Sequence, residues 1–521
     1  MMALDLLEVL ERQSVERPNM LALQETTGRR LTFSELHQRI GRVAGGLLAE
    51  GMRPGDRVLF TVPPGIDSIV LILAIVRAGG VVVAANPLMG PEVFASRIRL
   101  MEPRWVMATS LVYLLGRLRG PSFLRRLPVL PDLGAVPARR FVRVGPPLWG
   151  RPQMIALGSL VRADRPTEPV IPRQPDDPVV IIFTSGTTAA PRAVVHTNAS
   201  IGAALEIMSR EEHFAPGDVL YSDQLHLILP ALLDGVPTVI PRGRFRVARL
   251  LDHLRRYRVT HTFGVPSEYQ ELVEYAVAHQ LRLPDSLRKV LLGSAAVPAT
   301  FLRRLVPLLP LTTKVTCVYG MTEVIPVCLV DLDAKLEFRA DGDLVGAPVA
   351  GVQVRTAADG ELIVRGPNLC AGYWGDEPIT EVRTGDFGTL DASGRVVLLG
   401  RKKAMIIRGQ ENIYPELFES TIAGIAGVRR CCLVGLYQDQ RVDEQVVLCI
   451  EPDSEVDAAA LTARVWHELR QGPQRIDVAA LPDRIVVMPI PLSVRSRKVD
   501  RKALVAALGR LPFPVGSSQP C

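Results

Sequence analysis

A hydroxyl-rich turn directly after an apolar run contains the first residues suited to phosphate chemistry. The apolar run covers residues 179–183, and Arg192 follows the turn. The turn places four hydroxyl side chains around one glycine: Thr184, Ser185, Gly186, Thr187 and Thr188. Hydroxyl and backbone N–H groups of such a turn can surround phosphate oxygens, and the arginine supplies positive charge. The Gly-Lys-Ser/Thr signature of the nucleoside-triphosphate P-loop is absent, so the pattern predicts a phosphate loop of another type.

Residues 183–194 resemble the phosphate loop TSGTTGxPKG of the adenylate-forming superfamily, which includes acyl-CoA synthetases, nonribosomal-peptide adenylation domains and luciferases. Three positions differ from the family pattern, since Ala189 and Ala193 replace glycines and Arg192 replaces lysine. Alanine disfavours positive φ, so these positions either do not need it or make the loop stiffer. Arginine keeps the charge of lysine on a larger planar group, which predicts a different grip on phosphate.

Two further segments resemble the parts of the family's site that hold the nucleotide. Residues 293–297, with Ser294 and Ala295, are similar to the adenine-side turn. Residues 319–323 match the family's YGxTE as Tyr319, Gly320, Met321, Thr322 and Glu323. The resemblance implies that the tyrosine ring lies against the nucleobase, the threonine contacts the α-phosphate and the glutamate helps to hold Mg²⁺. Magnesium is expected because negative oxygens shield the α-phosphorus from an attacking carboxylate.

Two later segments are similar to the family's ribose and hinge motifs. Asp386 lies in a TGD sequence, whose aspartate is implied to accept hydrogen bonds from both ribose hydroxyls. Arg401 and Lys403 lie in a segment similar to the hinge motif GRxxD, although Ala404 stands where the family has aspartate. The resemblance implies that the arginine also reaches the ribose and that Lys403 is the pivot between two domains.

The C-terminal part of the chain resembles the family in two more places. Residues 409–415 (GQENIYP) are similar to GGENIYP, which implies that a pantetheine arm passes Gly409 on its way to the site. Lys498 occupies the place of the family's mobile lysine, with Arg497 instead of the usual glycine before it. All these motifs follow one another in the family's order, which makes their combination far more specific than any one of them.

The resemblance implies an ATP-consuming reaction in two steps. A carboxylate attacks the α-phosphorus in line, pyrophosphate departs on Mg²⁺, and an acyl-adenylate remains. Catalytic contributions are expected from four side chains: Thr188, Arg192, Glu323 and Lys498. The small domain then swings about Lys403, which withdraws Lys498 and admits a second nucleophile.

The acid and the acceptor are predicted less directly. His226 could gate the acyl pocket or simply pack in an apolar wall, and residues 225–233 contain no aspartate for an α-ammonium group. This favours a fatty or other apolar acid, although the nearby Asp223 keeps amino acids possible. GQENIYP favours transfer to a thiol of coenzyme A or an acyl carrier protein. Local strings such as residues 319–327 (YGMTEVIPV) look closest to the β-lactone synthetases of olefin biosynthesis, in which the substrate's β-hydroxyl is the acceptor.

A different class of function is a nucleotide-binding relative that has lost turnover and regulates a partner. The replaced loop glycines and Arg192 favour this alternative. The retained Glu323, Asp386, Arg401 and Lys498 favour an active enzyme.

Apolar periodicity predicts the elements that must position these residues. Helices are expected at residues 34–50 and 66–77, with strands at 57–62 and 81–85, and such alternation is typical of an α/β fold with helix-covered sheets. Residues 120–173, rich in Pro and Arg, are expected to form a long surface connection. The change of character after Gly400 predicts an N-terminal core domain, residues 1–400, and a small mobile C-terminal α+β lid, residues 401–521.

Composition excludes several other classes of protein. Of the 521 residues, 48% are hydrophobic and 22% are charged, which is typical of a globular protein. The formal charge of +7 comes from dispersed arginines, so we expect a solvated face and no nucleic-acid partner. The apolar run at residues 69–76 is too short to span a bilayer, and the N-terminus lacks a signal peptide's positive charge. Seven scattered cysteines fit reduced, buried thiols, and a cytoplasmic location follows.

Overall fold

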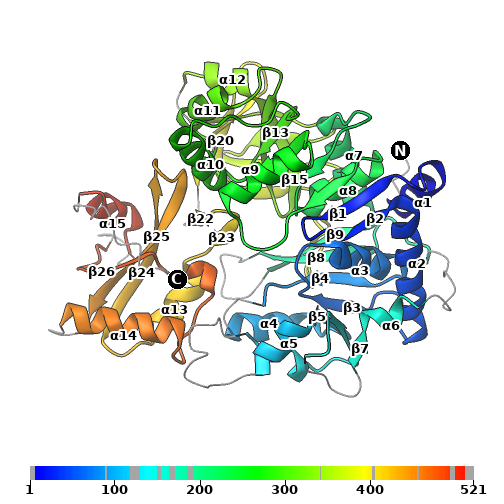
Figure 1. Cartoon of the computed structure of the whole chain (residues 1–521). Coiled ribbons are helices and arrows are strands. Elements are labelled where there is room, and N and C mark those ends of the chain that lie inside the picture. The colour runs from blue at the N-terminus through cyan, green and yellow to red at the C-terminus, as the bar shows by residue number, and fades with distance from the viewer. Residues whose placement is uncertain are drawn as a thin grey trace. The chain divides into compact units, whose positions relative to one another are not determined.

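The computed structural model describes residues 6–87, 91–117, 130–148, 154–162, 171–184, 192–340, 342–401, 405–453, 457–492 and 499–510. They form two compact units, of which the larger holds almost all described residues up to Arg401 and the smaller those from Met405 on (Figure 1). Both units combine helices with sheets, so the predicted α/β class is confirmed. The assignment of residues 1–400 and 401–521 as core and mobile lid stays a prediction.

The larger unit contains one extended mixed sheet. Its strand order is β17-β18-β20-β21-β16-β15-β14-β13-β12-β10-β11-β1-β2. Neighbouring strands from β14 to β1 in this order are parallel, and the remaining pairs are antiparallel. The bounds are β1 (Leu21–Glu25), β2 (Arg30–Thr32), β10 (Leu220–Tyr221), β11 (Thr238–Ile240), β12 (His261–Gly264), β13 (Lys289–Leu292), β14 (Lys314–Met321), β15 (Val324–Asp331), β16 (Asp343–Pro348), β17 (Gln353–Thr356), β18 (Glu361–Arg365), β20 (Val382–Leu390) and β21 (Val396–Arg401).

A second sheet of the larger unit carries the strands on both sides of the hydroxyl-rich turn. Its order is β19-β9-β8-β4-β3-β5-β6-β7. The bounds are β3 (Arg57–Phe60), β4 (Val81–Ala84), β5 (Trp105–Thr109), β6 (Arg140–Val144), β7 (Met154–Ala156), β8 (Pro178–Thr184), β9 (Arg192–Thr197) and β19 (Gly372–Tyr373). The prediction of one long connection over residues 120–173 is therefore wrong, because β6 and β7 lie within it. Prolines and arginines around these short strands hid their apolar alternation.

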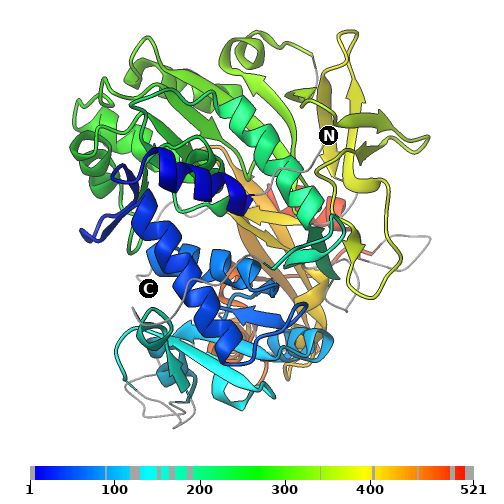
Figure 2. The same ribbon diagram turned by 90° about the vertical axis from the view of Figure 1, so that its right-hand side faces the viewer.

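Helices cover the sheets of the larger unit, and Figure 2 shows α1 and α2 side by side in blue. A capping box of Thr32 and Glu35 starts α2, within one residue of the prediction. Its apolar stripe, which includes Leu36 and Leu47, is buried in the core. The helix bounds are α1 (Leu6–Glu16), α2 (Phe33–Ala49), α3 (Ile66–Arg77), α4 (Pro91–Met101), α5 (Ser110–Arg117), α6 (Leu157–Leu160), α7 (Asn198–Glu212), α8 (Leu225–Leu233), α9 (Val247–Arg256), α10 (Pro266–Ala278), α11 (Ala299–Leu305) and α12 (Leu332–Glu337).

The smaller unit is a sheet of β24, β25 and β26 with helices on both faces. Cys431 packs with α13 and α14 on one face and Cys432 packs with α15 on the other, as the strand period of two requires. All cysteines of the described residues are unpaired and buried. The bounds are β22 (Ile406–Arg408), β23 (Glu411–Ile413), α13 (Glu416–Ala423), β24 (Val428–Gln438), β25 (Asp443–Pro452), α14 (Ala458–Arg470), β26 (Arg484–Val487) and α15 (Arg501–Leu508).

Candidate active site

The nucleotide motifs lie at the carboxyl ends of neighbouring parallel strands. Leu292 of β13 pairs with Cys317 of β14. Ser294 and Tyr319 each follow two residues later, so they lie at the same height on neighbouring segments. Ser294 has φ of 67°, and a Cβ on Gly293 would come within 2.5 Å of the Val318 side chain. The turn therefore needs glycine for close packing. Ligands of α/β sheets bind at such carboxyl ends, which fits a nucleotide here.

Tyr319 and Asp386 meet although 67 residues separate them. The tyrosine hydroxyl donates a hydrogen bond of 2.8 Å to the Asp386 carboxylate. Burial, followed by the Asp386 charge, raises the pKa of Tyr319 well above its usual value, so the hydroxyl stays protonated and able to donate. Asp386 also pairs with Arg401 across β20 and β21, which brings the TGD and hinge motifs together on the backbone. The structure describes no side-chain position for Arg401.

Glu323 lies in the tight turn between β14 and β15. Met321 pairs with Val324, so Thr322 and Glu323 are the two turn residues. Glu323 is only 7% exposed, and its Oε1 accepts a hydrogen bond of 2.8 Å from the Tyr373 hydroxyl. Gly320 precedes the turn, where a Cβ would lie 3.1 Å from the Ile325 side chain. The turn thus presents a buried, oriented carboxylate.

Two residues that support this turn carried no motif in the sequence. Tyr373 holds Glu323, and His196 on β9 makes a 2.7 Å hydrogen bond through Nε2 to the Thr322 carbonyl. Burial lowers the pKa of His196, so the ring is neutral and Nε2–H is the donor. Sequence reasoning missed both, because each acts on a turn of the other sheet and neither stands at a fixed spacing from its partner.

The phosphate-loop arginine begins β9. Thr184 pairs with Arg192, and the Arg192 guanidinium stacks 3.5 Å from the centre of the Tyr373 ring. Ala193 is buried within β9 opposite Phe183 and has no positive φ, so alanine is compatible with this position. The loop residues themselves lie outside the described part of the chain: Ser185, Gly186, Thr187, Thr188 and Ala189.

The predicted acyl-pocket residue, His226, lies in the first turn of α8. Its ring meets Phe263 edge-on with 6.0 Å between centroids, and burial lowers its pKa to about 4. Apolar residues surround this part of the sheet: Met208, Phe214, Leu220, Leu227, Ala231, Val236, Phe263, Leu291, Val318 and Leu329. Two carboxylates, Asp223 and Glu268, follow the carboxyl ends of β10 and β12. Burial, followed by the charges of Asp223 and Glu271, raises the pKa of Glu268 to about 7.

The remaining predicted residues belong to the smaller unit or lie outside the part of the chain that the structure describes. Gly409 has φ of 58° in the turn between β22 and β23, and its N–H donates to Asp443 at 3.0 Å. The turn itself therefore favours glycine at this position. Lys403 and Lys498 lie outside the described residues. The structure consequently brings Tyr319 to Asp386, and Glu323 to Tyr373 and Arg192. The roles of all these residues toward a nucleotide, like those of the lid residues, stay predictions.

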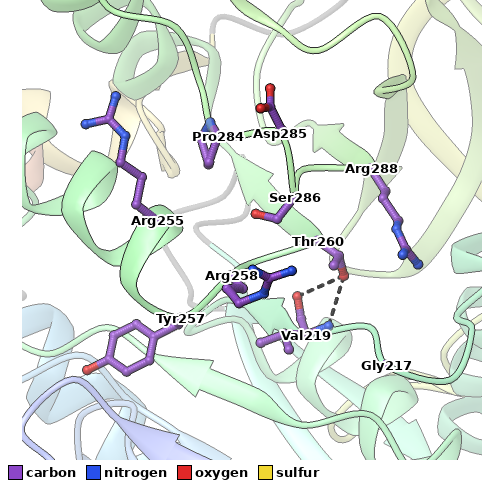
Figure 3. Close-up of a pocket in the computed structure, with 10 residues that line it drawn as sticks. All are labelled: Gly217, Val219, Arg255, Tyr257, Arg258, Thr260, Pro284, Asp285, Ser286 and Arg288. Carbon is purple, nitrogen blue, oxygen red and sulfur yellow. Dashed lines mark hydrogen bonds between the residues drawn. The ribbon is translucent and has the colours of Figure 1, made fainter.

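The larger unit also contains a hollow of about 660 Å³, which none of the nucleotide motifs lines (Figure 3). It is lined by Arg255, Arg258 and Arg288 near the amino ends of β12 and β13, whereas the motifs follow the carboxyl ends. The guanidinium groups of Arg255 and Arg288 point apart in Figure 3, and Asp218 already engages Arg288 at 2.8 Å. No convergent anion site results.

Two further findings on the described residues concern metal ions and membranes. Among them, no three or more His, Cys, Asp or Glu side chains are grouped to hold a metal ion by themselves. Within the same residues, none of the helices has the length and apolar character to cross a bilayer.

We expect the free energy of unfolding to decrease as the pH falls from about 6.5 towards 4. His226 keeps a lowered pKa in the folded protein, so the unfolded chain binds more protons in this window and stability is complete only above it. The loss is about 1.4 kcal/mol per pH unit for one such histidine. Denaturant unfolding of His226→Asn at several pH values should show a smaller slope. His279→Asn, at an exposed position, should keep the slope of the wild type.

Comparison with known proteins gives the same assignment as the site. Residues 10–374 match the family model described as AMP-binding enzyme. The chain is 31% identical to a feruloyl-CoA synthase of Amycolatopsis sp, over 86% of this chain and 89% of that protein. It is 28% identical to a fatty acid–[acyl-carrier-protein] ligase of Mycobacterium marinum, over 96% and 98%. An amide bond synthetase of Marinactinospora thermotolerans shares the fold, with a TM-score of 0.78 at 23% identity over 96% and 99%.

The fold and the nucleotide motifs define the class of protein as an AMP-forming ligase of the acyl-CoA or acyl-AMP synthetase type. The chain belongs to the AMP-binding enzyme family, whose model covers well over half of its length.

Proposed function

We propose that the protein activates an apolar carboxylic acid with ATP and transfers the acyl group to a thiol. In the first step a carboxylate oxygen bonds to the α-phosphorus, and the bond to the β-phosphate breaks to release pyrophosphate. In the second step the thiol sulfur attacks the acyl carbon, AMP leaves, and a thioester forms. The thiol would belong to coenzyme A or to an acyl carrier protein. The proposal includes the cytoplasmic location expected from the sequence.

The observation that carries the proposal is the pairing of Tyr319 with Asp386 beside the Glu323 turn. This arrangement offers an aromatic surface for adenine, a carboxylate for the ribose and a second carboxylate on the phosphate side. Ser294 and Ala295 would border the adenine, and Thr322 would contact the α-phosphate. The names of the coenzyme A and carrier-protein ligases among the relatives support a thiol acceptor.

An apolar acid fits the residues around His226. The side chains near this histidine are predominantly aliphatic or aromatic, and burial keeps the ring neutral near pH 7. A neutral histidine can line an apolar pocket without attracting a charged substrate group. In the proposal it gates this pocket.

Magnesium fits the Glu323 carboxylate. Tyr373 occupies one carboxylate oxygen, and the other accepts no hydrogen bond from the described residues. A hard cation prefers such an oxygen ligand. Bound there with ATP, Mg²⁺ would neutralise charge on the phosphates. Thr184, Thr188 and Arg192 would hold the phosphates, and Lys498 would stabilise the negative charge that develops during attack.

Product analysis tests the acid and the acceptor together. Paired 3-hydroxy and unsubstituted acids are incubated with ATP and Mg²⁺, each with and without coenzyme A, and the products are analysed by mass spectrometry. We expect an acyl thioester from the unsubstituted acid only when the thiol is present. A product lighter than the hydroxy acid by one water, formed without thiol, would instead establish a β-lactone synthetase. No pyrophosphate from any acid, with ATP still bound, would favour the inactive regulatory relative.

A further inference from the structure

The geometry points to Tyr373 as a positioning residue for the adenylation step. Its hydroxyl holds the Glu323 carboxylate, and its ring holds the Arg192 guanidinium. One side chain therefore fixes the positions of both the predicted metal ligand and the predicted phosphate-binding cation. This inference rests on the proposed function, because it assigns Tyr373 to the Mg²⁺ and ATP chemistry of the same site.

The backbone fastens Tyr373 to both partners. Strand β19 pairs with β9, where Tyr373 lies opposite Val194, two residues beyond Arg192. On the other side, the Cys370 N–H donates to the Glu323 carbonyl at 2.8 Å. Both contacts are main-chain hydrogen bonds, so they do not depend on the ligand. Tyr373 is therefore placed between its partners before ATP binds.

The ring of Tyr373 suits arginine better than lysine. The planar guanidinium lies 3.5 Å from the ring centre, and a flat cation can stack on an aromatic face in a way that a compact ammonium group cannot. Within the described residues, Arg192 makes no ion pair, so the ring is the contact that orients it. This provides a physical reason why arginine can replace the family's lysine here.

The hydroxyl of Tyr373 orients the Glu323 carboxylate. The hydroxyl is the donor in this contact, because an ionised carboxylate can only accept a hydrogen bond. The bond to Oε1 restrains a carboxylate that is nearly buried. Such a bond fixes which carboxylate oxygen faces a cation. Partners of this kind typically change metal affinity by about 10- to 100-fold.

The two roles of Tyr373 can be separated by substitution. Tyr373→Phe removes the hydroxyl but keeps the ring, so the Mg²⁺ concentration for half-maximal pyrophosphate release should rise about tenfold. Arg192→Lys keeps the charge but loses the stack, so kcat for pyrophosphate release should fall about tenfold at saturating Mg²⁺ while the half-saturating Mg²⁺ concentration is unchanged. Titration calorimetry of ATP at several Mg²⁺ concentrations supplies the same comparison for Tyr373→Phe without turnover.

Coupling through the ring is tested by combining substitutions. Once Tyr373→Leu has removed the ring, adding Arg192→Lys should cost little more, because the stack that arginine makes is already gone. Tyr275→Phe is the matched control, since this tyrosine of α10 stacks on His279 outside the site and should not change the Mg²⁺ dependence. The thermal midpoint of each variant confirms that it is folded.

The outcomes distinguish this inference from the proposed function. Unchanged Mg²⁺ dependence in Tyr373→Phe, in both activity and calorimetry, would overturn the role of the hydroxyl. Additive losses from Tyr373→Leu and Arg192→Lys would overturn the role of the ring. If no acid is turned over but Tyr373→Phe still weakens Mg²⁺-dependent ATP binding, the role of Tyr373 stands and the proposed function fails.

Discussion

Lys498→Ala is expected to slow acyl-adenylate formation by about 10²- to 10³-fold, the usual effect of losing one transition-state donor. The reason is that Lys498 would bridge the negative charge that develops between the carboxylate and the α-phosphate. Transfer from a supplied acyl-adenylate to a thiol should be nearly unchanged, because the lysine would have left the site by then. Pyrophosphate release and single-turnover transfer, measured separately, check the two halves of the prediction.

A matched control for this substitution is Lys502→Ala. Lys502 is an exposed residue of α15, four positions along the chain, so its loss changes the same net charge near the same end of the smaller unit. It should leave both half-reactions as they are. Equal losses in adenylation and transfer for Lys498→Ala would disprove the proposed division of labour.

Lys403→Pro should keep adenylation and lose transfer, the reverse of the result expected for Lys498→Ala. Proline fixes φ and would restrict the smaller unit to one orientation, if Lys403 is the pivot. Adenylation should then survive, whereas thioester formation should fall by at least about 10²-fold, the same scale as the loss of a catalytic group. Lys403→Ala, which leaves φ free to rotate, should retain most of the transfer activity. Full turnover of Lys403→Pro with a proven thiol acceptor would refute the pivot.

This substitution also separates the two acceptor hypotheses. A β-lactone forms when the substrate's own hydroxyl attacks the adenylate, so no thiol must enter and the second orientation is less important. An enzyme of that type should tolerate Lys403→Pro much better than a thioester-forming ligase. The same variant therefore tests both the hinge and the acceptor.

Much of the fold could be predicted from the sequence because its signals are local. The helices near Ser34 and Ile66 were within one residue of their predicted starts, since apolar periodicity and capping act over a few residues. Strands β24 and β25 of the smaller unit pair with each other along most of their length, which no local pattern encodes. Strands β6 and β7 were missed because prolines and arginines around them hide their apolar alternation, and because short strands depend on neighbours that are distant in the sequence.

The sequence by itself determined the chemistry that the protein can offer. Hydroxyl groups, carboxylates and cations in the order of the adenylate-forming motifs indicated nucleotide and phosphate binding, since residue types and short spacings are written in the chain. Only the tertiary structure decided which of these groups meet. Tyr319 reaches Asp386, and Tyr373 joins Glu323 to Arg192, through strand pairings that connect distant segments. Such contacts depend on sheet register, a property that no local pattern contains.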